Sequence, residues 1–392
     1  FEVNWKEEYM RKNCIVCGAK LIDNPIYVCR KMPAESQNLP DASSLNDDIP
    51  IDINLCQCSG CGLVQFDCDP VSYYKDSTRA GERCEALIEL RKQQYTHLIE
   101  TYCLQGKKIL EVGAGKGGFL KTLREMSEYS IQEFGIENNS EFVNIARNVE
   151  KVNMQQGDVE CLETQIEGAP FDAFVTFAYP ARLIDPNAML QCVSRHLTRD
   201  AVGLVQVPSM EHLLKPGGFY DITRDHVAYY SEATLKFLLV KNGFDILEFG
   251  EVSELYIYAI VKKRKSYDLQ TLWADVEPLA DEVRKYVNKN TEKGKKLAVW
   301  CAGHFAFTVL STAEIGNKVS YIIDNAEFKK GRYSPASHVP IVGPEHFFNE
   351  PVDTILILGP IYVNEIIREI REKYDPKVNI AVMDRRGLFE IE

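Results

Sequence analysis

The sequence predicts an α/β protein built on a doubly wound, mostly parallel sheet, and three observations support this fold class. The stretch Lys108-Ile-Leu-Glu-Val-Gly-Ala-Gly-Lys-Gly-Gly118 joins a short apolar run to four glycines within six residues, which indicates a buried strand and a tight turn. Residues 119–126 follow with apolar side chains at helical spacing. Strand and helix patterns then alternate to about residue 262, as in doubly wound sheets.

Composition narrows the class of protein. A chain of 392 residues with 45% hydrophobic content predicts two or three domains. The net charge of −12 argues against a broad nucleic-acid surface, which needs clustered Lys and Arg. We find no apolar run of membrane-spanning length and no signal peptide, and twelve scattered cysteines resemble reduced cytosolic thiols. A cytoplasmic enzyme with no membrane partner is the expectation.

Residues 1–70 are expected to form a small metal module. Cys14-Ile-Val-Cys17-Gly and Cys58-Ser-Gly-Cys61-Gly are two C-x-x-C-G knuckles. Two such pairs make a tetrahedral site that zinc fills at about 2.3 Å per sulfur. Four thiolates leave no open coordination position, so the predicted role of Zn²⁺ is structural. Cys56 is an alternative to Cys58 as a ligand.

Residues 71–264 are expected to form the central domain. A helix is predicted around Cys84–Cys103, and Tyr74, just before it, is expected either to cover the ligand cleft or to pack in a loop. The last two predicted strands form an antiparallel hairpin. The strands are expected at Lys108–Val112, Gln132–Ile136, Asn153–Gln156, Ala173–Phe177, Ala201–Gln206, Asp245–Phe249 and Tyr256–Val261.

The glycine turn predicts a cofactor site. Gly113, Gly115 and Gly118 fit G-x-G-x-x-G, so a dinucleotide is one candidate ligand. Carboxylates favour S-adenosylmethionine instead: Glu111 would face a sulfonium and an α-amino group, and Glu137 the ribose hydroxyls. This order of residues resembles the class I S-adenosylmethionine-dependent methyltransferases. The residues expected at the cofactor are Glu111, Gly113, Ala114, Gly115, Glu137, Asp158 (at the adenine amine), Val159 and Phe177.

The sequence pattern of residues 265–392 predicts a charged linker followed by a second α/β domain. A helix is expected near Leu272–Asn288, and the unit then opens with Leu297-Ala-Val-Trp-Cys-Ala-Gly-His304. Tyr321-Ile-Ile-Asp324 follows as a strand with a terminal carboxylate. Further strands are expected at Thr354–Gly359 and Asn379–Met383. Because Gly303 is the only glycine in the turn, this unit matches only part of a nucleotide-binding pattern.

Taken together, the chain resembles the three-domain sugar C-methyltransferases, which act on nucleotide-linked ketosugars. The likeness rests on the two cysteine knuckles, on Leu110-Glu-Val-Gly-Ala-Gly115, and on Asp225-His226 followed by Tyr229-Tyr-Ser231. The C-terminal series extends it: Trp300-Cys-Ala-Gly-His304, Ile323-Asp-Asn325, Lys330-Gly331 and His338-Val-Pro-Ile341. The resemblance implies a zinc module, a class I methyltransferase (Rossmann-like) core with a terminal antiparallel hairpin, and a Rossmann-like C-terminal domain that binds the nucleotide, dTDP or similar.

The resemblance also implies a mechanism. A carbon next to a ketone becomes nucleophilic after it loses a proton, and the family's base is the histidine of an acid–histidine pair, here Asp225-His226. A positioned base contributes about 10²–10⁴-fold. The carboxylate of Asp225 is expected to orient the ring, and Tyr74 is grouped with these catalytic residues. His212, on the same loop, is the second candidate base.

Three departures from the family pattern bear on the alternatives. Thr223 stands where the family commonly has Tyr, the acid of the pair is Asp225 rather than Glu, and residues 177–182 stand where the family often has polar residues near the cofactor sulfur. The first and the third favour a scaffold that binds the cofactor without turnover. An RNA or small-molecule methyltransferase is the other competing hypothesis, because some ribosomal RNA enzymes also carry a cysteine zinc module before the methyltransferase domain. A monomer or a homodimer is expected.

Overall fold

The computed structural model describes residues 11–75, 84–274, 276–359, 361–384 and 386–391. The chain divides into two compact units, Phe1–Lys265 and Ser266–Glu392. Within the described residues, no helix combines the length and the apolar composition needed to cross a membrane.

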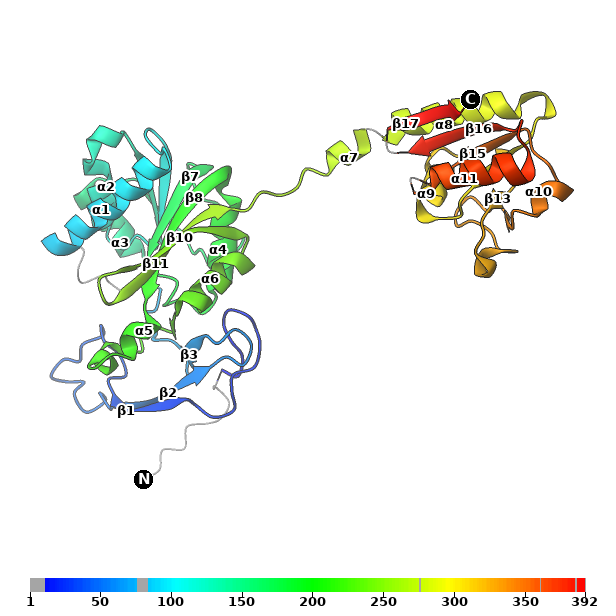
Figure 1. Ribbon diagram of the computed structural model, residues 1–392. Helices are drawn as coiled ribbons and strands as arrows, with labels where there is room; N and C mark the ends of the chain where they lie inside the picture. The colour runs from blue at the N-terminus through cyan, green and yellow to red at the C-terminus, as the bar shows by residue number, and fades with distance from the viewer. Residues whose placement is uncertain (1–10, 76–83, 275, 360, 385, 392) are drawn as a thin grey trace. The chain divides into compact units, whose positions relative to one another are not determined.

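The first unit contains the predicted doubly wound sheet, shown in Figure 1. Its strand order is β10-β11-β8-β7-β4-β5-β6, with β11 antiparallel to both neighbours and the remaining core pairs parallel. This is the strand order of a class I methyltransferase, including its terminal hairpin. The strands are β4 (Lys108–Val112), β5 (Gln132–Glu137), β6 (Met154–Gln156), β7 (Phe171–Phe177), β8 (Leu197–Pro208), β10 (Phe244–Val252) and β11 (Tyr256–Lys263).

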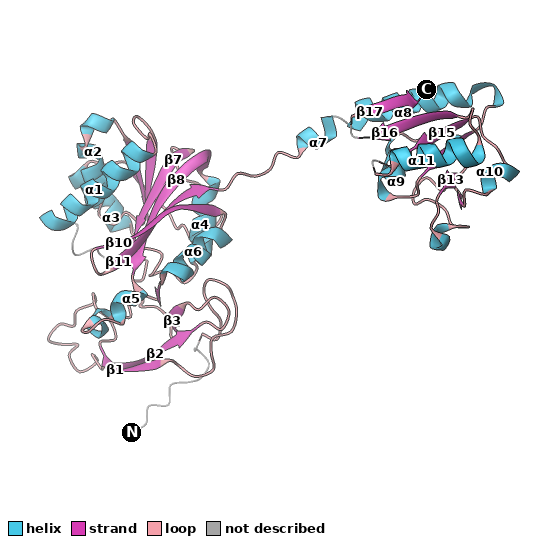
Figure 2. Ribbon diagram, viewed as in Figure 1, coloured by secondary structure: helices cyan, strands magenta, loops and turns pink. Residues whose placement is uncertain are grey.

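Helices cover both faces of this sheet, as Figure 2 shows. Alternate residues of a strand point to opposite faces. Ile109 therefore packs with the helices of one face, and its neighbour Leu110 packs with those of the other. One layer holds α1 (Glu85–Thr101), α2 (Gly118–Glu125) and α3 (Ser140–Ile145), and the other holds α4 (Pro186–Arg195) and α6 (Glu232–Lys241).

The cysteine-rich segment shares a sheet with the core. Strands β1 (Tyr27–Met32), β2 (Ile51–Gln57) and β3 (Val64–Phe66) form an antiparallel ribbon. Its fourth strand is β9 (Ala228–Tyr229), which belongs to the loop after β8. That loop also contains the short helix α5 (Met210–Leu213). A buried cluster that includes Ile53, Phe66 and Tyr229 closes this junction. The segment and the loop are therefore packed as one body.

The second unit is the expected α/β domain. Its strand order is β14-β13-β12-β15-β16-β17, parallel except for the last strand. The strands are β12 (Leu297–Trp300), β13 (Ile322–Ile323), β14 (Ile341–Val342), β15 (Thr354–Ile357), β16 (Asn379–Asp384) and β17 (Gly387–Ile391). The helices are α7 (Gln270–Ala274), α8 (Val276–Thr291), α9 (His304–Thr312), α10 (His346–Asn349) and α11 (Val363–Glu369).

The remaining helical elements are single turns at Ser127–Tyr129, Ala146–Glu150, Gly218–Asp221, Glu292–Gly294, Gly316–Lys318, Glu327–Lys329 and Ile370–Tyr374.

Most predicted strands coincide with observed ones. The apolar runs mark the buried centres, and the observed strands extend into flanking polar residues, most of all in β8. Two strands of the second unit, β14 and β17, were not predicted. The former has only two residues, and the latter reads Gly-Leu-Phe-Glu-Ile without a strict alternation. Too few residues are present in either strand for a periodic pattern.

Candidate functional site

The four predicted thiols meet at one point. The Sγ atoms of Cys14, Cys17, Cys58 and Cys61 all lie within 4.8 Å of one another. The Cys17–Cys58 and Cys14–Cys61 pairs are 3.3 Å and 3.6 Å apart. A zinc tetrahedron with bonds of about 2.3 Å has sulfur–sulfur edges of about 3.8 Å, so this donor set fits Zn²⁺. Cys56 is outside the cluster.

Each knuckle has the same local geometry. The amides of Gly60 and Cys61 donate to Cys58 Sγ at 3.3 and 3.4 Å, and equivalent bonds reach Cys14 Sγ. Gly18 and Gly62 close the turns with φ of +76° and +80°. That region favours glycine because it has no Cβ. These amide N–H groups therefore point at the two sulfur atoms.

The first knuckle is fixed to the core. Asn187 Nδ2, on α4, donates to the carbonyl oxygens of Ile15 and Val16 at 2.9 and 3.1 Å. Lys241 Nζ, on α6, also donates to Val16 O. The cluster is therefore held by two helices of the sheet as well as by its own turns.

The glycine turn after β4 has the geometry of a cofactor cradle. Gly113, Gly115 and Gly117 all have positive φ. A Cβ on Gly113 would lie 2.5 Å from the Tyr179 ring, so only glycine fits there. The amide of Gly115 donates to Glu137 Oε2 at 2.9 Å, which ties the turn to the end of β5.

The predicted carboxylates surround this turn. Glu111 is fully buried, and Glu137 is 5% exposed at the end of the next strand. Glu137 Oε1 accepts from the amides of Asn138 and Asn139 at 2.9 and 3.1 Å. These bonds hold the carboxylate at the turn. The cradle and its acidic residues fit a cationic nucleoside cofactor such as S-adenosylmethionine.

Lys75 is a cleft residue that the sequence analysis missed. Its Nζ lies 2.6 Å from Asp158 Oδ2 and 3.1 Å from Glu160 Oε2, and the hydroxyl of Tyr74 donates to the same Glu160 oxygen at 3.1 Å. The two carboxylates raise the pKa of Lys75 against the opposing effect of burial. Tyr74 thus lies next to Lys75, which lines the cavity at the glycine turn. Residues 76–78, part of the same predicted segment, lie outside the described residues.

A small cavity of about 10 Å³ marks the cleft. It is lined by Lys75, Gly113, Gly115, Glu137, Phe177, Tyr179 and Arg182. Ala114 and Val159 are buried in the packing around the turn. Phe177 stands at the end of β7, with the guanidinium carbon of Arg91 3.3 Å from its ring centre.

His226 lies on the loop that follows β8. The residue is half-buried, and its Nδ1 is buried without a hydrogen-bond partner among the described residues. Burial, and then the charge of Arg182, lower the pKa of His226 to about 3, so the imidazole is neutral. Because Arg182 also lines the cofactor cleft, it links the loop to that cleft.

Asp225, the predicted orienter of this ring, is bonded to other groups in the structure. The carboxylate is 4% exposed and accepts from Tyr73 Oη and Gln37 Nε2, both at 3.1 Å. Among the described residues it has no bond to the imidazole of His226. The reason is geometric: Asp225 faces the N-terminal segment of residues 11–75, which we call the cysteine module. Two donors from that segment satisfy its buried oxygens.

His212, the second candidate base, has a partner of its own. Its Nε2 lies 2.7 Å from the exposed Asp221 Oδ2, and its Nδ1 is buried without a partner among the described residues. Thr223, where the family commonly has Tyr, bonds to Ser36 Oγ at 2.8 Å.

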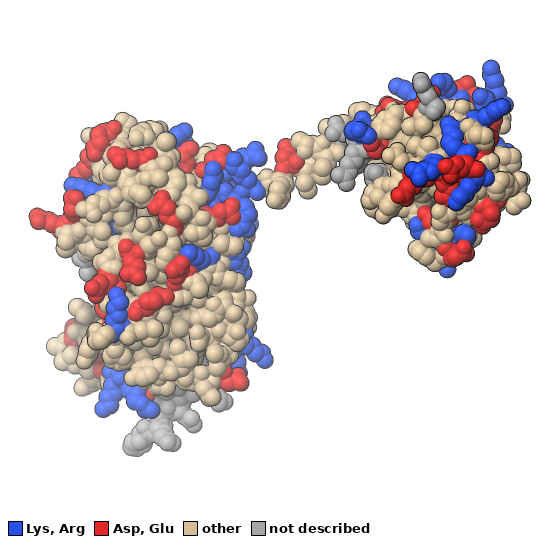
Figure 3. Space-filling view, in the orientation of Figure 1, with Lys and Arg blue, Asp and Glu red and all other residues tan. Residues whose placement is uncertain are grey.

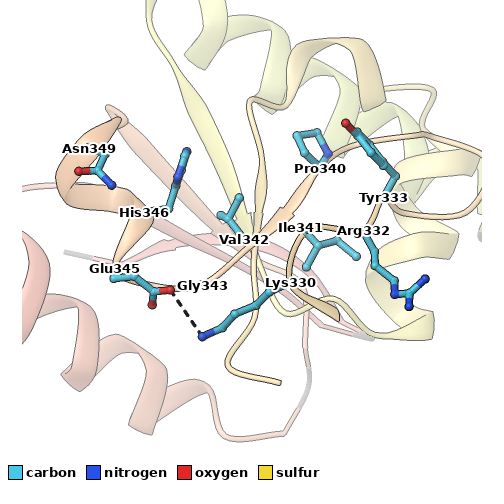
Figure 4. A pocket seen from close by; sticks show the side chains of 11 residues that line it. Lys330, Arg332, Tyr333, Pro340, Ile341, Val342, Gly343, Glu345, His346 and Asn349 are labelled. Carbon is cyan, nitrogen blue, oxygen red and sulfur yellow. Dashed lines mark hydrogen bonds and ion pairs between the residues drawn. The ribbon is translucent and has the colours of Figure 1, made fainter. Parts of the chain in front are cut away.

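The second unit contains a larger cavity of about 370 Å³, drawn in Figure 4. Lys330, Arg332, Tyr333 and His346 line it, all from segments around β14. Lys330 Nζ lies 2.6 Å from Glu327 Oε1 and 3.5 Å from Oε1 of Glu345, which also lines the cavity; the dashed line in Figure 4 marks the Lys330–Glu345 pair. The cavity therefore offers cations, an aromatic ring and hydrogen-bond donors.

Comparisons with known proteins match both units. A family model described as the C-methyltransferase C-terminal domain matches residues 260–382, and a methyltransferase domain model matches residues 86–248. The C-methyltransferase NovU of Streptomyces niveus is 22% identical over 361 residues, which covers 82% of this chain and 83% of the relative. Along the chain, the methyltransferase match precedes the C-terminal match, and both follow the four-cysteine cluster. These findings fit a three-domain C-methyltransferase.

Solved structures resemble the core of this C-methyltransferase. An S-adenosylmethionine-dependent methyltransferase from Clostridium acetobutylicum is 13% identical, covers 44% of this chain and 92% of its own, and has a TM-score of 0.36. A second from Aquifex aeolicus is 17% identical, with 45% and 97% coverage and the same TM-score. The class I assignment itself rests on the strand order described above.

Proposed function

We propose that the chain transfers a methyl group from S-adenosylmethionine to the carbon next to the keto group of a nucleotide-linked deoxysugar. The family and the cradle around Gly113 support the cofactor and the class of reaction. The ketosugar, the base and the nucleotide are our own inferences from the residues that follow.

The observation that carries the proposal is the state of His226. The imidazole is half-buried and neutral, and its Nδ1 has no hydrogen-bond partner among the described residues. It stands on the loop beyond the carboxyl end of β8, where ligands of open α/β sheets bind. Arg182, whose charge acts on the ring, also lines the cofactor cleft.

The proposed chemistry follows from this arrangement. The imidazole of His226 accepts a proton from the carbon next to the keto group, and the electron pair of that C–H bond passes into an enolate. S-adenosylmethionine, when bound, would supply the electrophilic methyl group: the carbon forms its new bond to the methyl as the S–CH₃ bond breaks, and that electron pair remains on the sulfur. Because the acceptor and the base are held in one cleft, the reaction no longer depends on a chance encounter between them in the right orientation.

We assign Zn²⁺ to the four-cysteine cluster as a structural ion. Cys14, Cys17, Cys58 and Cys61 would hold it and leave no position for substrate. We also propose a reducing, cytoplasmic location, because the twelve cysteines, all of them among the described residues, form no disulfide.

We propose that the second unit binds the nucleotide. In the cavity of Figure 4, Lys330 and Arg332 supply positive charge for phosphates and Tyr333 a ring face for the base. An RNA substrate is less well supported, because acidic and basic side chains are interspersed on the face seen in Figure 3 and the net charge is −12.

Mass spectrometry tests the proposal directly. The protein is incubated with S-adenosylmethionine and a set of keto-deoxysugars linked to dTDP, UDP or GDP. We expect one added CH₂ on one of them, and exchange of the acidic carbon-bound hydrogen in D₂O. If the cofactor binds but no ketosugar gains mass or deuterium, the substrate assignment is wrong.

A further inference from the structure

Residues 222–230, which we call the base loop because they carry His226, are attached to the cysteine module at several points. On β3, the amide of Phe66 donates to Val227 O at 3.0 Å, and Val64 pairs with Tyr229 of β9. The guanidinium of Arg224 donates to Asp69 O at 3.0 and 3.2 Å. On its other side, the amide of Val227 donates to Ala181 O of the core at 2.7 Å. The base loop is thus held between the module and the core.

The buried carboxylate of Asp225 is the central attachment. A carboxylate removed from water needs donors for its oxygens. Oδ1 accepts from Tyr73 Oη and Oδ2 accepts from Gln37 Nε2. Both donors come from the N-terminal segment, which is more than 150 positions away in the sequence.

The hydroxyl of Tyr73 has only one direction in which to donate. The amides of Ser36 and Gln37 both donate to it at 2.9 Å, which occupies its two lone pairs. Its proton is therefore directed at Asp225, 3.1 Å away. A hydroxyl fixed in this way orients a carboxylate better than a freely rotating one.

We propose that Tyr73 and Gln37 are positioning residues for the reaction: they hold Asp225, and through it they fix His226 at the cleft. The cysteine module is then a support for the general base and not only a folding element. The catalytic part of this inference rests on the proposed function, whereas the ordering of the base loop does not.

Hydrogen exchange tests the ordering without any substrate. Tyr73→Phe keeps the ring and removes the hydroxyl. Losing one such bond should speed amide exchange across residues 222–230 by about fivefold. Tyr27→Phe, which removes an exposed hydroxyl from β1 of the same module, should leave it unchanged. Equal exchange in wild type and Tyr73→Phe would overturn the inference.

A double-mutant cycle tests whether Tyr73 acts through Asp225. In an Asp225→Ala background the hydroxyl has no carboxylate to hold, so Tyr73→Phe should add less than about twofold to the exchange rate. Gln37→Leu is the second variant. It should speed exchange in the wild-type background but not in the Asp225→Ala background. Fully additive effects would mean that these side chains order the loop by another route, and the proposal would be wrong.

Kinetics separate positioning from stability. We expect Tyr73→Phe to lower kcat by roughly tenfold. The KM for S-adenosylmethionine, the zinc content and the calorimetric stoichiometry for S-adenosylhomocysteine should not change. If Tyr73→Phe instead binds less S-adenosylhomocysteine per chain and keeps a normal kcat per occupied site, Tyr73 has only a structural role and the positioning proposal is wrong. If wild type methylates no ketosugar, the proposed function fails, but the exchange cycle still decides the inference.

Discussion

At the scale of single residues, His226 is defined by what surrounds it. Burial and Arg182 keep the ring neutral, and its Nδ1 has no competing bond among the described residues. Asp225, its neighbour in sequence, belongs to another network. The two residues lie in a turn that the bond from the His226 amide to Thr223 O closes, so an acid–histidine pair in sequence need not be a hydrogen-bonded pair in space.

Replacing the proposed base should separate catalysis from cofactor binding. His226→Ala removes the proton acceptor, and we expect methyl transfer to fall by about 10²–10⁴-fold. The calorimetric Kd for S-adenosylhomocysteine should change less than about threefold, because no contact with the glycine turn is lost. His212→Ala, on the same loop, is the matched control and should retain activity. Normal turnover by His226→Ala would refute the assignment.

The depressed pKa of His226 also predicts a pH dependence of stability. The folded value is about 3 and the unfolded value about 6.5. Below pH 6.5 the unfolded chain therefore binds a proton that the folded chain does not. The free energy of unfolding should fall by up to about 1.4 kcal/mol per pH unit between pH 6.5 and 3. Urea titrations of His226→Gln should show a shallower fall than wild type; parallel curves would contradict the prediction.

At the scale of elements, the unit β4–turn–α2 builds the cofactor cradle. Parallel strands end at one edge of the sheet, so Gly113 after β4 and Glu137 at the end of β5 meet there. The Tyr179 ring packs on Gly113 at a distance that no side chain would allow.

Alanine at this turn should weaken the cofactor site specifically. Gly113→Ala places a Cβ 2.5 Å from the ring of Tyr179 at a φ of +67°. We expect the affinity for S-adenosylhomocysteine to fall by more than about tenfold, along with a stability loss of about 1 kcal/mol or more. Gly106→Ala has a similar φ of +71° but open space around it, so it controls for backbone strain. Equal affinities of the two variants would argue against a cradle at Gly113.

At the scale of the molecule, the cysteine module and the methyltransferase core are one packed unit. Their shared sheet, the bonds of Asn187 to the first knuckle and the attachments of the base loop all cross between them. Loss of the metal should therefore lower the stability of the methyltransferase core as well as that of the cysteine module.

Metal analysis tests this coupling. Cys58→Ser removes one thiolate of the cluster, and we expect less than one zinc per chain and a Tm several degrees lower, since metal binding contributes to folding. Cys56→Ser changes a buried cysteine two positions away that is outside the cluster, and it should keep one zinc. A zinc content that is unchanged in Cys58→Ser, or lost in Cys56→Ser, would refute the ligand assignment.

The sequence by itself determined the elements and the local motifs. Apolar runs such as Lys108–Val112 coincide with buried strands, and the hairpin Phe244–Lys263 follows from two adjacent runs. The four cysteines of the cluster were identified from spacing alone. These features are encoded by neighbouring residues, because periodicity, turns and metal knuckles are short-range properties of the chain.

Only the tertiary structure decided which polar side chains meet. Lys75 pairs with Asp158, and Tyr73 with Asp225, across 83 and 152 positions. Arg182 links His226 to the cleft by its place on the loop after β7. No local pattern marks such pairs, because they depend on how the strands and loops bring distant residues together, and burial then determines which of the available donors each carboxylate uses.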